Sequence, residues 1–280
     1  MGRKGNSGFA NPDVRFGKDG EISYTGSLGF TQHYLERLDG DLEPDPGLAP
    51  ADGFTIWLKA DSGISLNGTS GVSEWADQST NQIDFGQSST SAQPTFTSAN
   101  TILNNQPSVD FFNNDFLASD DNSVMNTSTG FCVYVVAKVN STPSTFSGFY
   151  GRTNGTSWST GWFAFYYAGK LRFCVDYWNT STKRVELDLP NVSNVNIYKF
   201  HYDRTTITGQ IIGPDADLDT QAQTTSDINA TGEGVELNRL GSSAYDGSWD
   251  FGEFIYYNTP LNAAGQTKTE NYLKDKYGIT

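Results

Sequence analysis

Two carboxylates, Glu186 and Asp188, have a spacing that could support chemistry. They alternate in the stretch VELDLPN, so an extended strand would place both side chains on one face. Retaining hydrolysis of a glycosidic bond needs a nucleophile and, roughly 5–5.5 Å away, a second carboxyl group that protonates the leaving group. Pro190 and Asn191 follow after Leu189, and nothing local supplies that acid. We therefore interpret the stretch as an acidic surface strand and expect no enzymatic activity.

Three aspartates in the stretch PDADLDT, Asp215, Asp217 and Asp219, are spaced like the opening of a calcium-binding loop. Oxygen ligands at alternate positions suit Ca²⁺. The longer pattern then fails, because Thr220 occupies the glycine position and Ser226 the position of the bidentate glutamate. The sequence favours an acidic hairpin turn over a calcium site, and we predict no metal and no cofactor.

Histidine and cysteine are scarce in this chain. The only histidines are His33 and His201, and the only cysteines, Cys132 and Cys174, lie in separate strand-like runs without a CxxC pair. This inventory disfavours a Cys/His zinc site and a Ser-His-Asp triad. His201 alternates with apolar residues on the polar face of a strand and is expected to be solvated. A free thiol in a strand behaves as a small buried hydrophobe, so we predict two reduced thiols.

Tryptophans beside polar groups are the residues best suited to bind carbohydrate, since a sugar ring presents an apolar face and a set of hydroxyl groups. Trp178 is the first candidate, because Arg172 and Asp176 alternate with it along one strand face. Trp158, in the loop-like stretch TNGTSWSTGW, is the second. We predict that these four residues form a glycan contact. The alternative is that both tryptophans are ordinary packing residues.

A hairpin in the stretch GWFAFYYAGKLRFCVDYW would position this face. A strand over 162–167 is followed by a turn at Ala168, Gly169 and Lys170, and by a second strand over 171–178. Period two assigns one face of the second strand to the core, formed by Leu171, Phe173, Val175 and Tyr177. A second hairpin is predicted in IYKFHYDRTTITGQIIG, where apolar and polar residues again alternate.

Short strand-like runs separated by Gly, Asn, Ser and Thr continue from Phe54 onward, which is typical of a sandwich or jelly roll. One helix is expected near residues 263–277, because Asn262 can cap its start and Gly278 can end it. We therefore predict an all-β fold, a two-sheet antiparallel jelly-roll sandwich over residues 54–280, with a C-terminal helix and an extended N-terminal arm.

Residues 1–38 are predicted to be a docking arm. Glycines recur through this segment and alternate with isolated aromatic residues, among them Phe9, Phe16, Tyr24 and Phe30. Such a segment buries little of itself, so its ordering entropy is offset only when the rings enter a partner's surface. One short helix is expected at FTQHYLERL, and a disordered tail is the alternative. Residues 39–53, with prolines among acidic residues, favour an extended linker.

The charge balance excludes whole classes of partner. The formal net charge of −14, from 18 Lys+Arg against 32 Asp+Glu, repels phosphate backbones, so nucleic acid is excluded. No run approaches the roughly 18 apolar residues of a membrane span, and no apolar segment follows the basic N-terminus. We expect a soluble chain without a Sec-type signal and without membrane insertion.

Several segments, in order, resemble the laminin G-like branch of the concanavalin A-like lectin/glucanase superfamily. They are FTIWLKADSGIS (54–65), the Trp-x-Asp-x-Ser element WADQS (75–79), NNQPSVDFFNNDFL (104–117), the tyrosine–aspartate hairpin at 198–213, the strand NRLGSSA (238–244), and the C-terminal strand and helix. Asn105 and Gln106 stand where the third motif usually has Asn-Gly. The resemblance spans about residues 54–280 and implies a two-sheet jelly roll with the terminal helix packed near it.

The resemblance does not settle the function, because this fold serves sugar binding, adhesion, hydrolysis and scaffolding. Laminarinase-type members carry Glu-x-Asp-x-x-Glu, and here the third carboxylate after Glu186 and Asp188 is missing. We predict a non-enzymatic structural or adhesion protein, present in many copies on a large assembly. The assembly we favour is a phage virion, with the chain as a capsid decoration or a tail or fibre component. Its predicted partners are other virion proteins, through the arm, and host-surface glycans. The alternatives are an extracellular glycan-binding module of a bacterial surface or secreted protein and, third, a glycoside hydrolase.

Overall fold

The computed structural model describes residues 13–16, 22–25, 49–68, 70–142, 146–154, 158–223, 228, 230, 232–241 and 247–280. Contacts divide the chain into two units, Met1–Asp45 and Pro46–Thr280. The second unit carries the predicted sandwich. None of the helices in the described residues combines the length and the apolar character that crossing a bilayer requires.

The first unit contains a short antiparallel hairpin within the predicted extended arm. Strand β1 (Asp13–Phe16) pairs with β2 (Ile22–Thr25), with Phe16 opposite Ile22. Of the predicted docking residues, Phe16 and Tyr24 lie in these two strands. Phe9, Phe30 and the helix expected at FTQHYLERL lie outside the described residues.

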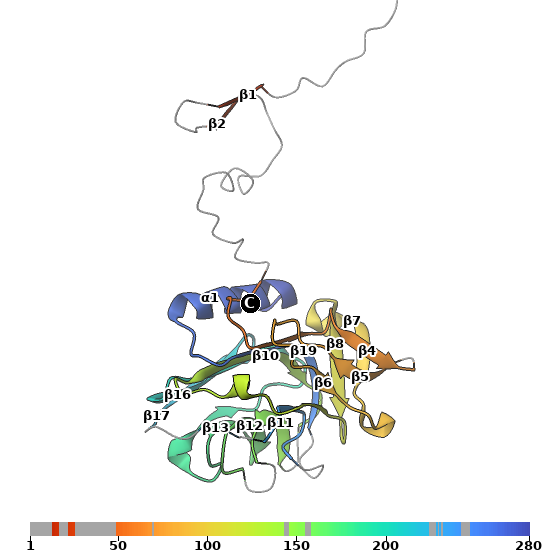
Figure 1. Cartoon of the computed structure of the whole chain (residues 1–280), viewed down its shortest axis with the longest axis vertical. Coiled ribbons are helices and arrows are strands. Elements are labelled where there is room, and N and C mark those ends of the chain that lie inside the picture. Colours follow the sequence, from red (N-terminus) through yellow and green to blue (C-terminus); the bar gives the residue numbers. More distant parts are fainter. Residues whose placement is uncertain are drawn as a thin grey trace, which may run out of the picture. The chain divides into compact units, whose positions relative to one another are not determined.

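The second unit is almost entirely antiparallel, and the 17 strands in its described residues form one hydrogen-bonded network folded into two layers (Figure 1). One layer, the first sheet, runs in the order β17, β16, β15, β10, β19, and β19 then pairs with both β3 and β8. Its strands are β3 (Ile56–Lys59), β8 (Gln106–Phe112), β10 (Phe131–Val139), β15 (Val195–Tyr202), β16 (Thr206–Ile212), β17 (Asp217–Ala222) and β19 (Ser248–Tyr257).

The other layer, the second sheet, runs in the order β14, β13, β12, β11, β18, β9, β6, β5. Its strands are β5 (Gly71–Trp75), β6 (Phe85–Gly86), β9 (Leu117–Ser119), β11 (Ser147–Arg152), β12 (Trp162–Tyr167), β13 (Lys170–Val175), β14 (Arg184–Asp188) and β18 (Glu236–Leu237). Strand β4 (Ile64–Asn67) pairs with β5, while β7 (Thr95–Asn100) pairs with β5 and β8 and so joins the layers. Short 3₁₀ turns occupy Thr90–Ala92, Thr101–Leu103, Ser123–Met125 and Ser181–Lys183.

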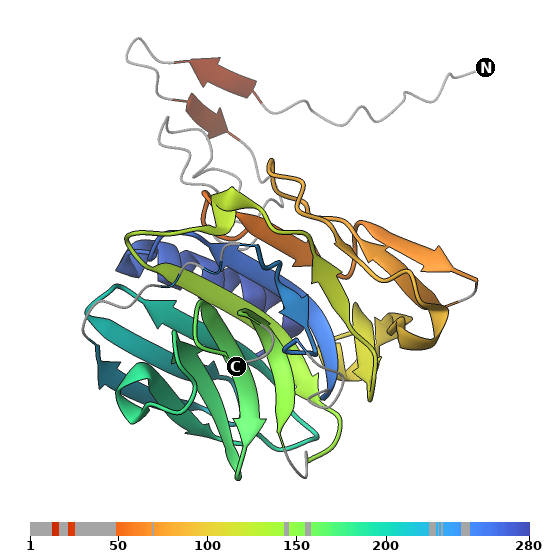
Figure 2. The same ribbon diagram turned by 60° about the horizontal axis from the view of Figure 1, so that its bottom comes forward.

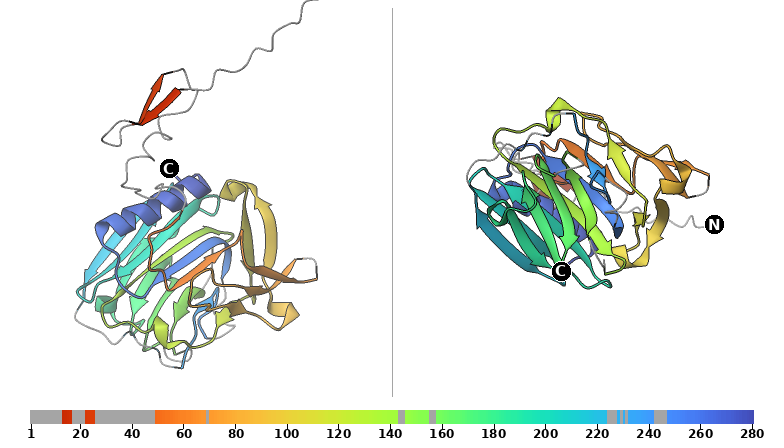
Figure 3. Two further views of the ribbon diagram at one scale, coloured as in Figure 1. Left: turned by 45° about the horizontal axis from the view of Figure 1, so that its top comes forward. Right: turned by 90° about the horizontal axis from the view of Figure 1, so that it is seen from below.

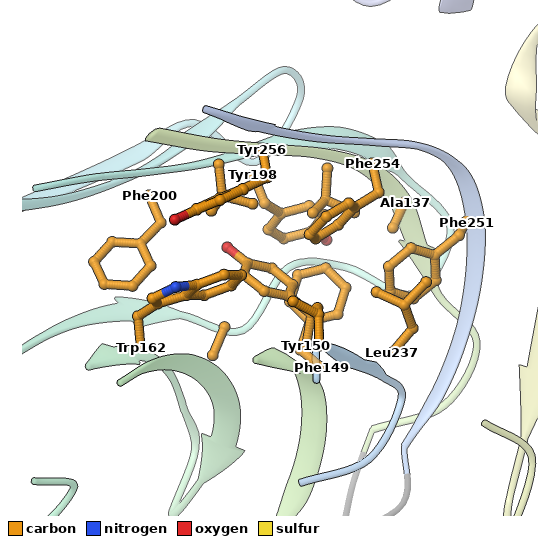
Figure 4. Packing of buried hydrophobic residues seen from close by; sticks show 14 of the residues in the cluster. Ala137, Phe149, Tyr150, Trp162, Tyr198, Phe200, Leu237, Phe251, Phe254 and Tyr256 are labelled. Atoms are coloured by element: carbon orange, nitrogen blue, oxygen red, sulfur yellow. The ribbon is translucent and has the colours of Figure 1, made fainter. Parts of the chain in front are cut away.

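Aromatic rings from the two sheets meet in the core (Figure 4). Trp162 of β12 stacks on Tyr256 of β19, with ring centroids 4.9 Å apart. Tyr150 of β11 meets Phe254 of β19 edge to face at 5.6 Å. A buried aromatic side chain removes roughly 150–250 Å² from water, so pairs of this kind supply much of the burial that holds the layers together.

Helix α1 (Ala263–Tyr277) covers the outside of the first sheet, as Figures 1 and 3 show. The Asn262 side chain accepts a hydrogen bond from the Gly265 amide at 2.8 Å, and Gly278 ends the helix in the left-handed conformation, with φ of 65°. The predicted helix and both of its end signals are thus confirmed. Tyr272, Leu273 and Tyr277 are its buried hydrophobic residues.

Two boundaries predicted from the sequence, the end of the linker and the end of the strand over 171–178, differ in the structure. Ala51 lies in the predicted linker, yet it is buried: its amide donates to Thr269 Oγ1 at 3.1 Å and its carbonyl accepts from Tyr257 OH at 3.0 Å. Packing of the body therefore begins before Phe54. Strand β13 ends at Val175, because Asp176 takes a left-handed conformation with φ of 65°, and this breaks the alternation. The assignment of Tyr177 to the core was therefore wrong, and its side chain is 39 % exposed.

Candidate functional site

A row of directly paired residues crosses the second sheet, whose green strands come forward in Figure 2. Two of these residues, Phe163 and Cys174, belong to a cluster separate from the core between the sheets, so the row lies on the side away from the first sheet. Directly opposed residues of antiparallel strands present their side chains on the same face. From β5 to β14, the successive partners are Glu74, Gly86, Ala118, Glu236, Gly151, Phe163, Cys174 and Arg184. This side of the sheet is referred to below as the outer face of the second sheet. Of the four residues predicted to contact a glycan, Arg172 lies on it directly, two residues before Cys174 in β13.

An aromatic cluster occupies the β12–β14 end of the outer face. Phe146 lies at its centre, stacked on Tyr167 at a centroid distance of 4.0 Å and edge-on to Trp178 at 5.4 Å. Trp158 meets Trp178 edge-on at 6.2 Å. The cluster, referred to below as the aromatic patch, consists of Phe146, Trp158, Phe163, Phe165, Tyr167 and Trp178.

The two predicted tryptophans differ in exposure. Trp158 is only 6 % exposed, and its indole N–H donates to the Leu240 carbonyl at 3.2 Å, so it supports the patch from within. Trp178 is half-buried and stands at the patch surface beside the exposed ring of Tyr177, 6.4 Å away. Tyr177 is thus a candidate contact residue that sequence reasoning missed, because its position depends on the left-handed turn at Asp176.

Charged side chains tie the patch to its strands. The Arg172 guanidinium lies over the Tyr167 ring, 4.8 Å from its centroid, and pairs with Glu186 at 3.0 Å. Glu186 also pairs with Arg184 at 2.8 Å, and Arg184 Nη1 donates to the Trp178 carbonyl at 3.3 Å. These contacts fix the backbone at Trp178 and hold Arg172, which is 8 % exposed, against the rings.

The remaining predicted polar residue, Asp176, forms an ion pair with Lys183. Asp188 pairs with Lys170 at 2.5 Å on an exposed edge. The structure thus brings Trp178, Trp158 and Arg172 together at the aromatic patch. It places Asp176 in the turn after β13, paired with Lys183.

The aspartates of the calcium-like stretch have structural partners. Asp219 Oδ2 accepts from the Glu186 amide at 2.9 Å, and Asp217 Oδ2 accepts from the Asp188 amide at 2.8 Å. Asp215 accepts from the side-chain amide of Asn196 at 2.9 Å. Within the described part of the chain, no group of three or more His, Cys, Asp or Glu side chains is arranged to hold a metal ion.

Neither cysteine offers a reactive thiol. Cys174 lies within the aromatic patch, whereas Cys132 packs between the first sheet and α1, and both are free, as predicted. Burial raises the pKa of the Cys132 thiol to about 12 and that of Cys174 well above its usual range. Since the thiolate is the nucleophilic form, both act as packing groups.

The opposite end of the row is hollowed. A cavity of about 570 Å³ opens beside Glu74, where the small residues Gly86 and Ala118 leave space on the face of the sheet. A smaller hollow of about 250 Å³ shares Asp84 and Asp120 with it. The larger cavity, referred to below as the acidic pocket, is lined by Asn67, Ser73, Glu74, Asp84, Gly86, Gln87, Ser88, Gln93, Ala118 and Asp120.

No local sequence pattern predicts this pocket. Its residues come from three separate segments, and two strands beside it, β6 and β18, have only two residues each, too few to show alternation. The one local signal is Gly86, whose missing side chain leaves space within a strand.

Comparisons with known proteins support the fold. No protein-family model matches the chain, and no curated protein sequence matches it. The binding domain of Paraclostridial Mosquitocidal Protein 1 superposes with a TM-score of 0.53 at 12 % identity, over 80 % of this chain and 52 % of that chain. A sialidase of Trypanosoma rangeli gives a TM-score of 0.55 at 14 % identity, over 82 % of this chain and 34 % of that chain.

The binding domain of Botulinum neurotoxin DC, solved in complex with rat synaptotagmin II, gives a TM-score of 0.50 at 12 % identity, over 81 % of this chain and 52 % of that chain. The chain therefore spans about half, or one third, of the length of these neighbours. At such low identity the similarity shows the all-β fold alone.

Proposed function

We propose that this protein is a non-enzymatic binding module that attaches to carbohydrate through the outer face of its second sheet. The observation that carries the proposal is the single row that joins the aromatic patch to a polar cavity on one face. Phe146, Tyr167 and Trp178 are the partly exposed members of the patch. Aromatic rings stack on the apolar face of a sugar, and polar side chains bind its hydroxyl groups. The mosquitocidal and neurotoxin neighbours are named as binding domains, which is in keeping with a binding role for such a fold.

The surroundings of Glu186 and Asp188 support the non-enzymatic part of the proposal. Glu186 pairs with two guanidinium groups and Asp188 with an ammonium group. General acid catalysis of glycoside cleavage needs a carboxyl group that can carry and release a proton at the leaving oxygen. A carboxylate engaged by two arginines is poorly placed for that task.

The proposal extends to family and setting. The order of segments from 54 to 280 favours a concanavalin A-like, laminin G-like module, and the separate N-terminal unit favours attachment to a large assembly. The assembly we favour is a phage virion, which the chain would join in many copies, and host-surface glycans are the ligands we favour there. Peptide mass spectrometry of purified particles tests this setting. Particles that lack the chain would contradict it.

A glycan array followed by calorimetry on the full chain tests the binding function. We expect Trp178→Ala to weaken binding at the patch by roughly 1–3 kcal/mol, as removal of a stacking platform does. The matched control is Phe112→Ala, an exposed aromatic on β8 that belongs to neither the patch nor the pocket. A blank array contradicts the function. Release of reducing ends from laminarin, β-glucan or agar that Glu186→Gln abolishes contradicts its non-enzymatic part.

A further inference from the structure

We propose that the acidic pocket selects a carbohydrate that carries an ammonium group, an amino sugar, and that it rejects sialic acids and other anionic sugars. The inference deepens the proposed function and rests on it. Its volume of about 570 Å³ falls within the range of small-ligand sites, roughly 300–1,000 Å³.

Charge is the first reason. Among the described residues, the lining contains three carboxylates, from Glu74, Asp84 and Asp120, and no lysine, arginine or histidine. A ligand that brings a positive charge relieves the repulsion among the three, and an anionic sugar adds to it. The whole chain, at −14, biases the approach of ligands in the same direction.

Gln87 is the second and independent reason. It lines the pocket, is only 8 % exposed, and its Nε2 has no hydrogen-bond partner within the described residues. The orientation of the amide is fixed, because Oε1 accepts from the Ser89 amide at 2.8 Å. A buried donor without an acceptor is unfavourable. Nε2 itself is enclosed in the unliganded protein, so a ligand oxygen that satisfies it reaches it only when neighbouring side chains move. A hydroxyl or ring oxygen beside an ammonium group supplies what both features require.

The lining also argues against a basic peptide. Lysine and arginine side chains pack their long methylene stems along apolar surface when their charged ends are bound. In the part of the lining that the structure describes, the apolar members are Gly86 and Ala118, which offer little such surface. An amino sugar is polar on all sides and has no stem to bury.

Gly86 allows the pocket to be blocked without disturbing the sheet. Its backbone has an ordinary φ, and an added Cβ would meet nothing closer than the Ser73 carbonyl at 3.7 Å. Valine suits a strand position, so Gly86→Val fills the pocket while leaving β6 intact. Glu74→Gln is the second variant, since it keeps the shape of an exposed side chain and removes one charge. Asp275→Asn, exposed on α1, is the control for the change in net charge.

Calorimetry with the full chain at low salt tests the inference, with a glucosamine trimer, its fully N-acetylated counterpart and N-acetylneuraminic acid as probes. We expect the glucosamine trimer to bind roughly ten-fold or more tightly than the acetylated trimer, and sialic acid not to compete. Gly86→Val and Glu74→Gln should each weaken the glucosamine trimer by a similar factor, and Asp275→Asn should leave it unchanged. Thermal unfolding establishes that each variant is folded.

The other outcomes separate this inference from the proposed function. Equal binding of both trimers, or competition by sialic acid, overturns the selectivity. A lysine-rich peptide should not compete at the pocket. If it displaces the glucosamine trimer, and Gly86→Val also prevents the peptide from binding, the assignment of the ligand as an amino sugar is overturned. Sugar binding that is lost in Trp178→Ala and normal in both pocket variants overturns the inference and leaves the function standing. A chain that binds no sugar on the array or in the calorimeter contradicts both the inference and the proposed function.

Discussion

Glu253 is the residue on which the attachment of α1 depends. It is fully buried in β19 and accepts hydrogen bonds from Trp57 Nε1 at 2.5 Å, Tyr272 OH at 2.9 Å and Tyr277 OH at 3.1 Å. Lys276 Nζ lies 2.8 Å from its carboxylate. Three of these four donors belong to the helix, so one carboxylate joins α1 to the first sheet.

Glu253→Gln should therefore lower the free energy of unfolding by roughly 1–3 kcal/mol, because a neutral amide weakens the buried bonds from Tyr272, Tyr277 and Lys276. The Lys276 ammonium keeps its second partner, Asp61, at 3.2 Å. Urea unfolding followed by circular dichroism measures the change. The control is Asp188→Asn, whose carboxylate is 79 % exposed in its pair with Lys170, and which should change stability by roughly 1 kcal/mol or less. Equal effects in the two variants would show that the buried cluster is not what holds α1.

His201 makes stability depend on pH. Its side chain shares a strand with Lys199, as the alternation predicts, but it is half-buried rather than solvated. Burial lowers the pKa of the His201 imidazole, nearby Lys199 lowers it further, and Asp203 opposes them. The unfolded chain, with a histidine pKa of about 6.5, then binds the proton more readily than the folded chain.

The free energy of unfolding should accordingly be fully retained above about pH 6.5 and fall as the pH drops below it. We expect this fall to be smaller in His201→Gln, since every other titrating group is common to both proteins. Urea unfolding at about pH 7.5 and about pH 5.5 compares them. Identical pH dependence in the two proteins would remove His201 as its source.

At the scale of elements, the edge strands β14 and β17 of the two sheets are joined by side-chain hydrogen bonds rather than by backbone pairing. Asp217 and Asp219 of β17 accept hydrogen bonds from the amides of Asp188 and Glu186 in β14. An unpaired edge strand is a template for pairing with another chain. These carboxylates therefore satisfy the β14 edge, and they explain an alternation of aspartates that resembles a calcium loop.

Asp219→Ala should destabilise the fold by roughly 1–2 kcal/mol, because it removes the acceptor of the Glu186 amide. It should also raise light scattering on incubation, since the β14 edge is then open to pairing. Asp219→Asn keeps an acceptor oxygen and should lie much closer to the native protein in both measurements. If alanine and asparagine behave alike, charge rather than edge closure is the role of Asp219.

Elements with strong local signals were predictable. The β12–β13 hairpin follows from alternation around Ala168 and Gly169, whose positive φ values of 52° and 84° suit a two-residue turn. Helix α1 follows from its two end residues. Strands of two residues, such as β6 and β18, have no period to read, and pairing across distant segments makes them strands.

At the scale of the whole molecule, the aromatic patch and the acidic pocket differ in how much of each could be predicted from the sequence. Trp178, Arg172 and Asp176 lie within seven consecutive residues, so their closeness in sequence was enough to predict that they are neighbours. The strand pattern that assigned them to one face ends at Val175, because Asp176 is left-handed. The acidic pocket joins Glu74 and Asp84 to Asp120 through the pairing of β5, β6 and β9. Tertiary pairing of this kind leaves no local trace, and the buried donor of Gln87 is visible only in three dimensions.

The division of the chain into two units supports a division of labour between attachment and binding. The β1–β2 hairpin has four residues in each strand, and an isolated hairpin of this kind is at best marginally stable. Burying a large aromatic ring contributes roughly 1.5–3 kcal/mol. The rings of Phe9, Phe16, Tyr24 and Phe30 could therefore offset much of the ordering entropy of residues 1–38 once they enter a partner's surface.

Deletion of residues 1–38 should accordingly leave the second unit folded, with an unchanged urea midpoint and unchanged sugar binding, yet unable to join its assembly. The reason is that the core, the hydrogen bonds to Glu253 and the outer face all lie within Pro46–Thr280. Co-sedimentation with purified particles measures incorporation, and Trp178→Ala in the full chain is the control that should incorporate normally while binding sugar less well. Full incorporation of the truncated chain would mean that the sandwich itself docks, and the aromatic arm would then need another role.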